Sequence, residues 1–175
     1  MLRISALAAV VKAGRFGADK GAPGVTLSVI HPVTIVMAIA RKGKANALNQ
    51  TLTDMKEVEV HWAGADQYYI YNAPYTELKQ QLEGLASLTD QSHGRVVLRI
   101  SGPKSRAVLA KGTAVDLHES KFPIGKSALT QMAHVSVHLT RSGDNEFTLS
   151  VFRGFSESFW QWLVSQAGEF GYQVT

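Results

Sequence analysis

Cysteine is absent from this chain of 175 residues, and so is any long uninterrupted run of apolar residues. The first absence excludes disulfides, thiolate metal sites and cysteine nucleophiles, and it suits a reducing compartment, so we expect a cytoplasmic protein. The second predicts that no helix spans a membrane, because a spanning helix needs about 18 or more consecutive apolar residues.

Acidic residues are scarce in the first third of the chain. Residues 1–56 contain eight Lys/Arg against two Asp, a balance of +6, whereas residues 57–175 carry −2. The basic cluster Arg41, Lys42 and Lys44 could meet nucleic-acid phosphates. No aromatic residues interleave with these bases, so the stacking component of a nucleic-acid surface is missing. The favoured interpretation is a solvated face or a contact with an acidic partner subunit.

The first 24 residues differ in composition from the rest. A charged start and the small apolar stretch Ile4–Val11 have the outline of a signal peptide, but Lys12 and Arg15 follow directly and no convincing cleavage site precedes them. Residues 14–24 contain four glycines and a proline. We therefore expect residues 1–24 to form a flexible arm with few contacts to its own domain, docked on a partner subunit. A cleaved signal is the alternative.

Strand and helix periodicities alternate from residue 25 onward. Alternating apolar positions predict strands, and apolar stripes at spacings of three and four predict helices. In the first half the strands fall at 26–40, 58–62 and 68–71 and the helices at 45–55 and 75–85; in the second half the strands fall at 96–100, 133–139 and 147–151 and the helices at 103–109 and 156–167. Each half has the order β-α-β-β-α. This predicts an α+β fold over residues 25–175, with two ferredoxin-like halves sharing a core.

Two groups of polar residues are candidates for chemistry. His134 and His138 lie about 13 Å apart if both are on one strand, too far to bind a single zinc ion. We expect both to face solvent. Asp116 and His118 place a carboxylate near an imidazole, but acid/base catalysis also needs a substrate within hydrogen-bond reach. A loop in which both side chains cap backbone groups is the preferred interpretation.

Two further segments are typical of ligand sites but fit structural roles better. Residues 101–105 predict a strand–turn–helix without the spacing of a phosphate-binding loop, and Pro103 removes an N–H from the helix start. The aromatic residues of the last helix have the spacing of a core or interface stripe; they are Phe155, Phe159, Trp160 and Trp162. From the residues alone we assign no catalytic, cofactor-binding or metal-binding position.

A family resemblance extends over most of residues 26–172. Its most specific segments are Val97–Pro103, Leu109–Gly112, Val115–His118 with Phe122-Pro123 and Gly125, Val151–Phe155 and Phe159–Leu163, preceded by the turn His61–Tyr68. Together they resemble the gamma subunit of heterotetrameric sarcosine oxidase. Related amine-oxidising complexes, such as N-methylglutamate dehydrogenase, look similar in this region.

The resemblance implies a fold shared with the folate-binding domain of aminomethyltransferase. It also implies alpha, beta and delta partner subunits that bind FAD, FMN, NAD and tetrahydrofolate and demethylate sarcosine oxidatively, while this chain holds no cofactor and has a structural role. The alternative is a free-standing folate-binding module acting in one-carbon transfer or RNA modification.

Overall fold

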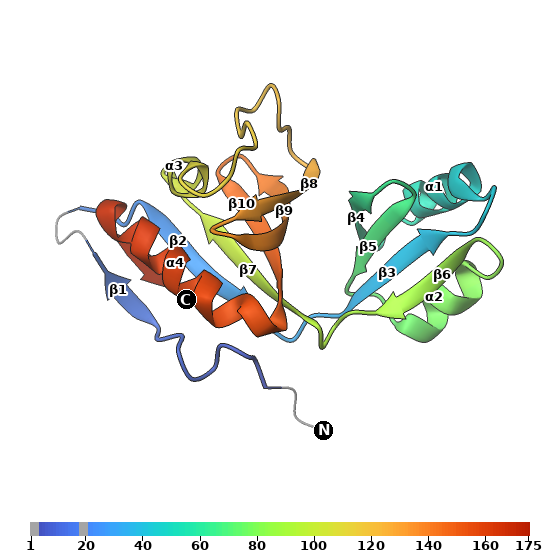
Figure 1. Cartoon of the computed structure of the whole chain (residues 1–175), viewed down its shortest axis with the longest axis horizontal. Coiled ribbons are helices and arrows are strands. Elements are labelled where there is room, and N and C mark those ends of the chain that lie inside the picture. Colours follow the sequence, from blue (N-terminus) through green and yellow to red (C-terminus); the bar gives the residue numbers. More distant parts are fainter. Residues whose placement is uncertain (1–3, 18–20) are drawn as a thin grey trace. The chain divides into compact units, whose positions relative to one another are not determined.

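The structure is a computed structural model that describes residues 4–17 and 21–175. The chain divides into two compact units (Figure 1). Unit 1 combines the N-terminal residues up to Pro32 with Arg95–Thr175, and unit 2 is the continuous segment Val33–Gly94. The α+β class is confirmed, since each unit consists of one β-sheet with helices.

Unit 1 is built on a seven-stranded sheet with the order β1-β11-β2-β7-β10-β9-β8. Its strands are β1 (Gly14–Phe16), β2 (Val25–Ile30), β7 (Arg95–Ser101), β8 (Ser127–Met132), β9 (Val135–Gly143), β10 (Glu146–Phe152) and β11 (Tyr172–Val174). Neighbouring strands are antiparallel except β2 and β11, which run parallel. The long hairpin β9–β10 and strand β7 form the centre of this sheet.

Two helices bury one face of this sheet. They are α3 (Ser105–Ala110) and α4 (Ser156–Ala167), the latter flanked by the 3-10 turns η1 (Arg153–Phe155) and η2 (Gly168–Phe170). Leu98 and Leu149 lie opposite each other on β7 and β10, and both pack in one buried cluster with Phe159 and Leu163 of α4. Each such side chain contributes roughly 2 kcal/mol of transfer free energy on burial.

The N-terminal segment also belongs to this core. Leu7 is fully buried in the cluster, Val10 and Val11 pack against it, and β1 pairs with β11. The prediction of an arm with few contacts to its own domain is therefore wrong for residues 4–17; residues 1–3 and 18–20 lie outside the described part. The glycines around β1 suggested flexibility, whereas the apolar residues before them supply enough burial to order the segment.

Unit 2 has the strand and helix order of a complete ferredoxin-like domain, β-α-β-β-α-β. Its elements are β3 (Ile35–Ala40), α1 (Ala45–Asp54), β4 (Glu59–Gly64), β5 (Gln67–Tyr71), α2 (Tyr75–Gln81) and β6 (Ala86–Asp90), with the sheet order β4-β5-β3-β6. The predicted helical stripes are confirmed: Leu48 and Leu52 of α1, with Leu78 of α2 and Leu82 after it, are buried.

The boundary between the units lies within the predicted strand region 26–40. The chain leaves unit 1 after β2 and enters unit 2 before β3, so β2 pairs with β7 and β11 of the second half. The buried residues accordingly form two clusters, one in each unit, where the periodicity predicted a shared core. Alternation identifies a strand but does not specify its distant partner.

No helix in the described residues is long and apolar enough to cross a membrane.

Candidate interaction surface

The sheet of unit 1 carries polar residues on the face opposite α3 and α4. On this face His138 of β9 pairs with Ser150 of β10, and Thr140 pairs with Thr148. The prediction that His138 faces solvent is wrong, because its side chain is only 1% exposed. The strand alternation was correct, but polar side chains of a strand are not always solvated. His134 is exposed and lies in the turn before β9, with a φ of 65°, so the two histidines do not share a strand face.

His138 and Ser150 combine a hydroxyl and an imidazole in directly opposed positions, as a nucleophile and its base would require. The Ser150 hydroxyl is fully buried and accepts or donates no hydrogen bond in the described part of the chain. An activated serine needs both a bond to its base and access for a substrate. Neither condition is met at Ser150.

Asp116 and His118 form a local turn, as the sequence predicted. The His118 N–H donates to Asp116 Oδ1 at 2.9 Å, the Ser120 N–H donates to His118 Nδ1 at 3.3 Å, and the latter nitrogen also lies 2.8 Å from Ser120 Oγ. The carboxylate and the imidazole therefore cap backbone groups of their own loop. No group of three or more metal-ligating side chains occurs in residues 4–17 and 21–175.

The turn after β7 bonds to two neighbouring segments of the chain. The Lys104 N–H donates to the Gly24 carbonyl at 3.0 Å, and the Ser105 hydroxyl donates to the Asn145 carbonyl at 3.0 Å. Gly102 has a φ of 115°, and a Cβ there would lie 2.7 Å from the Gly24 carbonyl oxygen. These donors of the turn thus bind the start of β2 and the β9–β10 turn.

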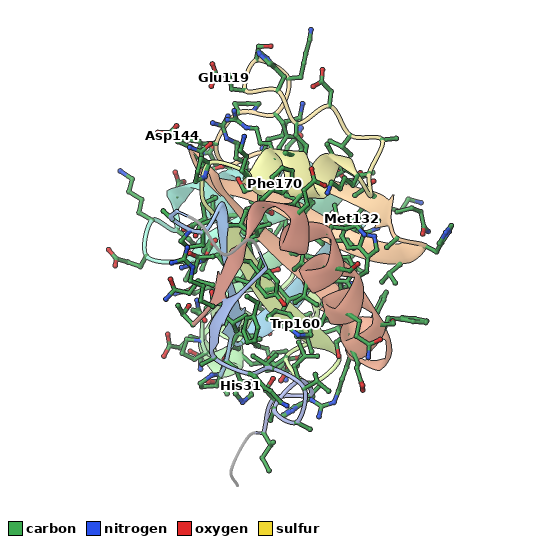
Figure 2. The ribbon with its side chains drawn as sticks, turned by 90° about the vertical axis from the view of Figure 1, so that its left-hand side faces the viewer. His31, Glu119, Met132, Asp144, Trp160 and Phe170 are labelled. Carbon is green, nitrogen blue, oxygen red and sulfur yellow. The ribbon has the colours of Figure 1, made fainter. Side chains whose placement is uncertain are left out.

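The aromatic residues of the last helix divide between core and surface. Phe159 and Trp160 are buried, and Trp162 stacks on Phe159 with ring centroids 5.6 Å apart. Figure 2 shows Trp160 on α4 beside the sheet. Phe155, in the 3-10 turn before α4, remains 56% exposed. Phe152 is also exposed, with the Arg95 guanidinium 4.3 Å above its ring.

A second exposed apolar region lies on the loop between α3 and β8, residues 111–126, and on β8 itself. The loop projects beyond the sheet in Figure 1, and Glu119 marks its outer part in Figure 2. Leu117 and Phe122 are buried and anchor the loop, while Ile124 is 56% and Leu129 of β8 is 52% exposed. A well-anchored loop that presents apolar side chains outward is typical of a contact site.

Arg141 fixes the base of this loop, although it was not among the candidate functional residues from the sequence. Its buried guanidinium donates to the carbonyl oxygens of Phe122 at 3.1 Å, Gly143 at 3.1 Å and Asp144 at 3.2 Å. The Gly125 N–H donates in turn to the Arg141 carbonyl at 2.8 Å. Through these three bonds one guanidinium connects the loop to the β9–β10 turn. Arg141 lies two residues beyond the predicted strand 133–139 and continues the alternation of Val135, Val137 and Leu139, which was the available signal.

Unit 2 has a separate surface groove of about 650 Å³ beside α2 and β6. Arg41, Lys79 and Glu83 are among the residues that line it, and Arg41 Nε donates to the Ala86 carbonyl at 3.4 Å. Lys42 and Lys44 are exposed in the loop before α1. The mixed charges of the groove do not converge on one kind of ligand.

Solved structures define the class of protein to which this architecture belongs. A chain of "Heterotetrameric Sarcosine Oxidase from Corynebacterium sp. U-96 in complex with pyrrole 2-carboxylate" is similar with a TM-score of 0.80 and 25% identity, over 97% of each chain. Glycine cleavage system aminomethyltransferase T from Bartonella henselae is similar with a TM-score of 0.61 and 14% identity, over 87% of this chain and 48% of that one. The second likeness shows the fold alone.

The sarcosine oxidase gamma subunit family model matches residues 47–169, and the chain belongs to that family. Sarcosine oxidase subunit gamma of Corynebacterium sp. strain U-96 is 27% identical over 133 residues, which are 73% of this chain and 65% of that protein. The same subunit of Corynebacterium sp. strain P-1 is 30% identical over 118 residues, 63% of this chain and 57% of that protein. The chain thus matches about two thirds or less of the length of these relatives.

Proposed function

We propose that this chain is a non-catalytic structural subunit of a heterotetrameric sarcosine oxidase-type flavoenzyme, with alpha, beta and delta subunits as its partners. The observation that carries the proposal is the likeness to a chain of heterotetrameric sarcosine oxidase over 97% of both chains. In the proposed complex the partner subunits hold FAD, FMN, NAD and tetrahydrofolate. They demethylate sarcosine to glycine and pass the one-carbon unit to tetrahydrofolate, and the cysteine-free composition suits a cytoplasmic complex.

The surface of unit 1 supports a role in assembly. Ile124, Leu129 and Phe155 are each more than half exposed in this chain. A partner that covers these side chains removes apolar area from water. Each side chain that becomes fully buried contributes about 1.5–3 kcal/mol of transfer free energy. The residues that could have formed a catalytic group, Asp116 and His118, are bonded to their own loop.

Co-expression with the alpha, beta and delta subunits, followed by gel filtration, tests this function. We expect the chain to co-elute with the other three subunits and the isolated chain to be colourless and inactive toward sarcosine. An isolated chain that purifies with bound flavin, or a chain that elutes apart from the other subunits, would contradict the proposal.

Calorimetric titration of the isolated chain with tetrahydrofolate separates this function from that of a free-standing folate-binding module. The aminomethyltransferase likeness shows the fold alone, and a shared fold is weak support for a binding site. We expect no measurable heat. Micromolar binding, about −8 kcal/mol, would favour the alternative.

A further inference from the structure

β8 is the terminal strand of the seven-stranded sheet, and one side of its backbone faces away from β9. The Arg141 N–H of β9 donates to the Lys126 carbonyl directly before β8, so the peptide groups of residues 128, 130 and 132 also face β9. The N–H and C=O groups of Ser127, Leu129 and Gln131 therefore face outward. No residue of the described chain bonds to these groups of Ser127 and Leu129, whereas the Gln131 carbonyl accepts from the Thr130 hydroxyl.

The other terminal strands are shorter, irregular or covered. β1 has three residues, and β4 is bulged at Trp62–Gly64. On β6 the outward carbonyls of Ala86 and Leu88 accept hydrogen bonds from the Arg41 guanidinium and the Tyr75 hydroxyl, each at 3.4 Å. Short length, bulges and covering side chains are the usual protection against strand addition. β8 has six residues, a regular register with β9, and no proline.

The side chains around β8 indicate the chemistry of an added strand. Ile124 and Leu129 are exposed, so a neighbouring strand would gain apolar contacts. From residue 120 to the end of β8 the charged residues are Lys121 and Lys126, while Glu119, earlier in the loop, lies 3.8 Å from the Arg106 guanidinium. Both lysines are exposed in the loop before β8, where Lys126 Nζ donates to the Lys121 carbonyl at 2.7 Å. A complementary segment carries acidic residues at this end and an apolar residue beside Leu129.

We infer that β8 is the docking edge for an extended, acidic segment of a partner subunit, which adds a strand to the seven-stranded sheet. This inference rests on the proposed function, because it assigns the partner's position within the same complex. Because Ser127 is only 8% exposed, backbone hydrogen bonds to Leu129 and to the Gln131 N–H supply the attachment. Lys121 and Lys126 select the partner by charge.

Leu129→Pro tests the backbone bonds. The Leu129 N–H faces away from β9, so proline there leaves the β8–β9 ladder intact and removes only the outward donor. We expect the variant to fold as an isolated chain, with an unchanged circular dichroism spectrum, and to weaken assembly of the co-expressed complex by about tenfold or more. Leu129→Thr is the matched control, since it keeps the N–H and loses only apolar area, and it should weaken assembly less.

Amide hydrogen exchange reads the same bond without a mutation. Assembly should slow exchange of the Leu129 N–H by at least about tenfold, a change of about 1.4 kcal/mol in opening free energy. The Leu88 N–H, outward on the β6 edge, is the reference and should not change. Normal assembly of the Leu129→Pro variant, together with an unprotected Leu129 N–H in the wild-type complex, overturns this inference alone. A wild-type chain that does not assemble overturns the proposed function as well.

Dimerisation of the isolated chain would identify a different occupant of this edge. If the isolated chain dimerises at micromolar concentration and Leu129→Pro abolishes the dimer, β8 pairs with a second copy and the partner-segment inference is wrong.

Lys121→Glu should lower the association rate of the complex about tenfold at low salt, whereas Lys56→Glu in unit 2 should not. Equal rates for both variants would refute the acidic character of the segment.

Discussion

Truncation of Leu7 measures how firmly the N-terminal segment belongs to unit 1. Leu7 is fully buried, and its carbonyl accepts hydrogen bonds from the N–H groups of Val10 at 3.0 Å and Val11 at 2.9 Å. Replacing a buried leucine by alanine removes its transfer free energy and leaves a cavity, which together cost about 3 kcal/mol. For a chain of this size, Leu7→Ala should lower the melting temperature by roughly 6–12 °C.

Ile4→Ala is the matched control for this truncation. Ile4 lies on the same segment and loses a side chain of the same size, but it is 65% exposed. Its removal should change the free energy of unfolding by less than about 0.5 kcal/mol. Urea titrations of the isolated chain, followed by far-ultraviolet circular dichroism, compare the two variants. Equal, small changes in the free energy of unfolding for both variants would refute the packing of this segment and favour the original prediction of a flexible arm.

Three further predictions concern unit 1. Gly112→Ala would place its Cβ 2.4 Å from the indole of Trp162 and should lower the free energy of unfolding, measured in urea, by about 1–3 kcal/mol. Gly154→Ala, whose Cβ would have no atom within 4 Å, should change that free energy little. Equal losses for both variants would contradict the packing. Arg141→Met removes one buried and two partly buried hydrogen bonds and should cost about 3 kcal/mol. It should also speed amide exchange in residues 111–126, and unchanged exchange would refute its anchoring role. Burial raises the pKa of Tyr172, so above about pH 10 the unfolded state loses its proton before the folded state does, and stability falls as pH rises. Tyr172→Phe should remove this fall in urea titrations from about pH 9 to 11, and identical slopes for both proteins would contradict it.

Local structure followed closely from the sequence. The stripe of Leu48 and Leu52 and the alternation of Val135, Val137 and Leu139 have the periods of a helix and a strand, and their side chains are buried as those periods predict. Pro74 also lies directly before α2, where the start of a helix tolerates proline.

Long-range pairing did not follow from the sequence. β2 joins β7 and β11 instead of β3, because an alternating strand carries no record of which distant strand completes its ladder. The edge of β8 was equally hidden, since its outward N–H groups depend on the register with β9. His138 was placed in solvent because a polar residue on a strand is usually exposed, and its burial depends on the tertiary structure.

The discontinuity of unit 1 bears on the order of events during synthesis. β2 leaves the ribosome before any residue of unit 2, but its partner β7 and its parallel neighbour β11 are made only after residue 94. Unit 2 is continuous and has its own core, so we expect it to fold while β2 still waits for a partner. A folded insert also shortens the flexible chain between β2 and β7, which lowers the entropy cost of closing that loop by roughly 2 kcal/mol. We therefore expect that a mutation that unfolds unit 2 lengthens the time for which β2 is unpaired and exposed to aggregation.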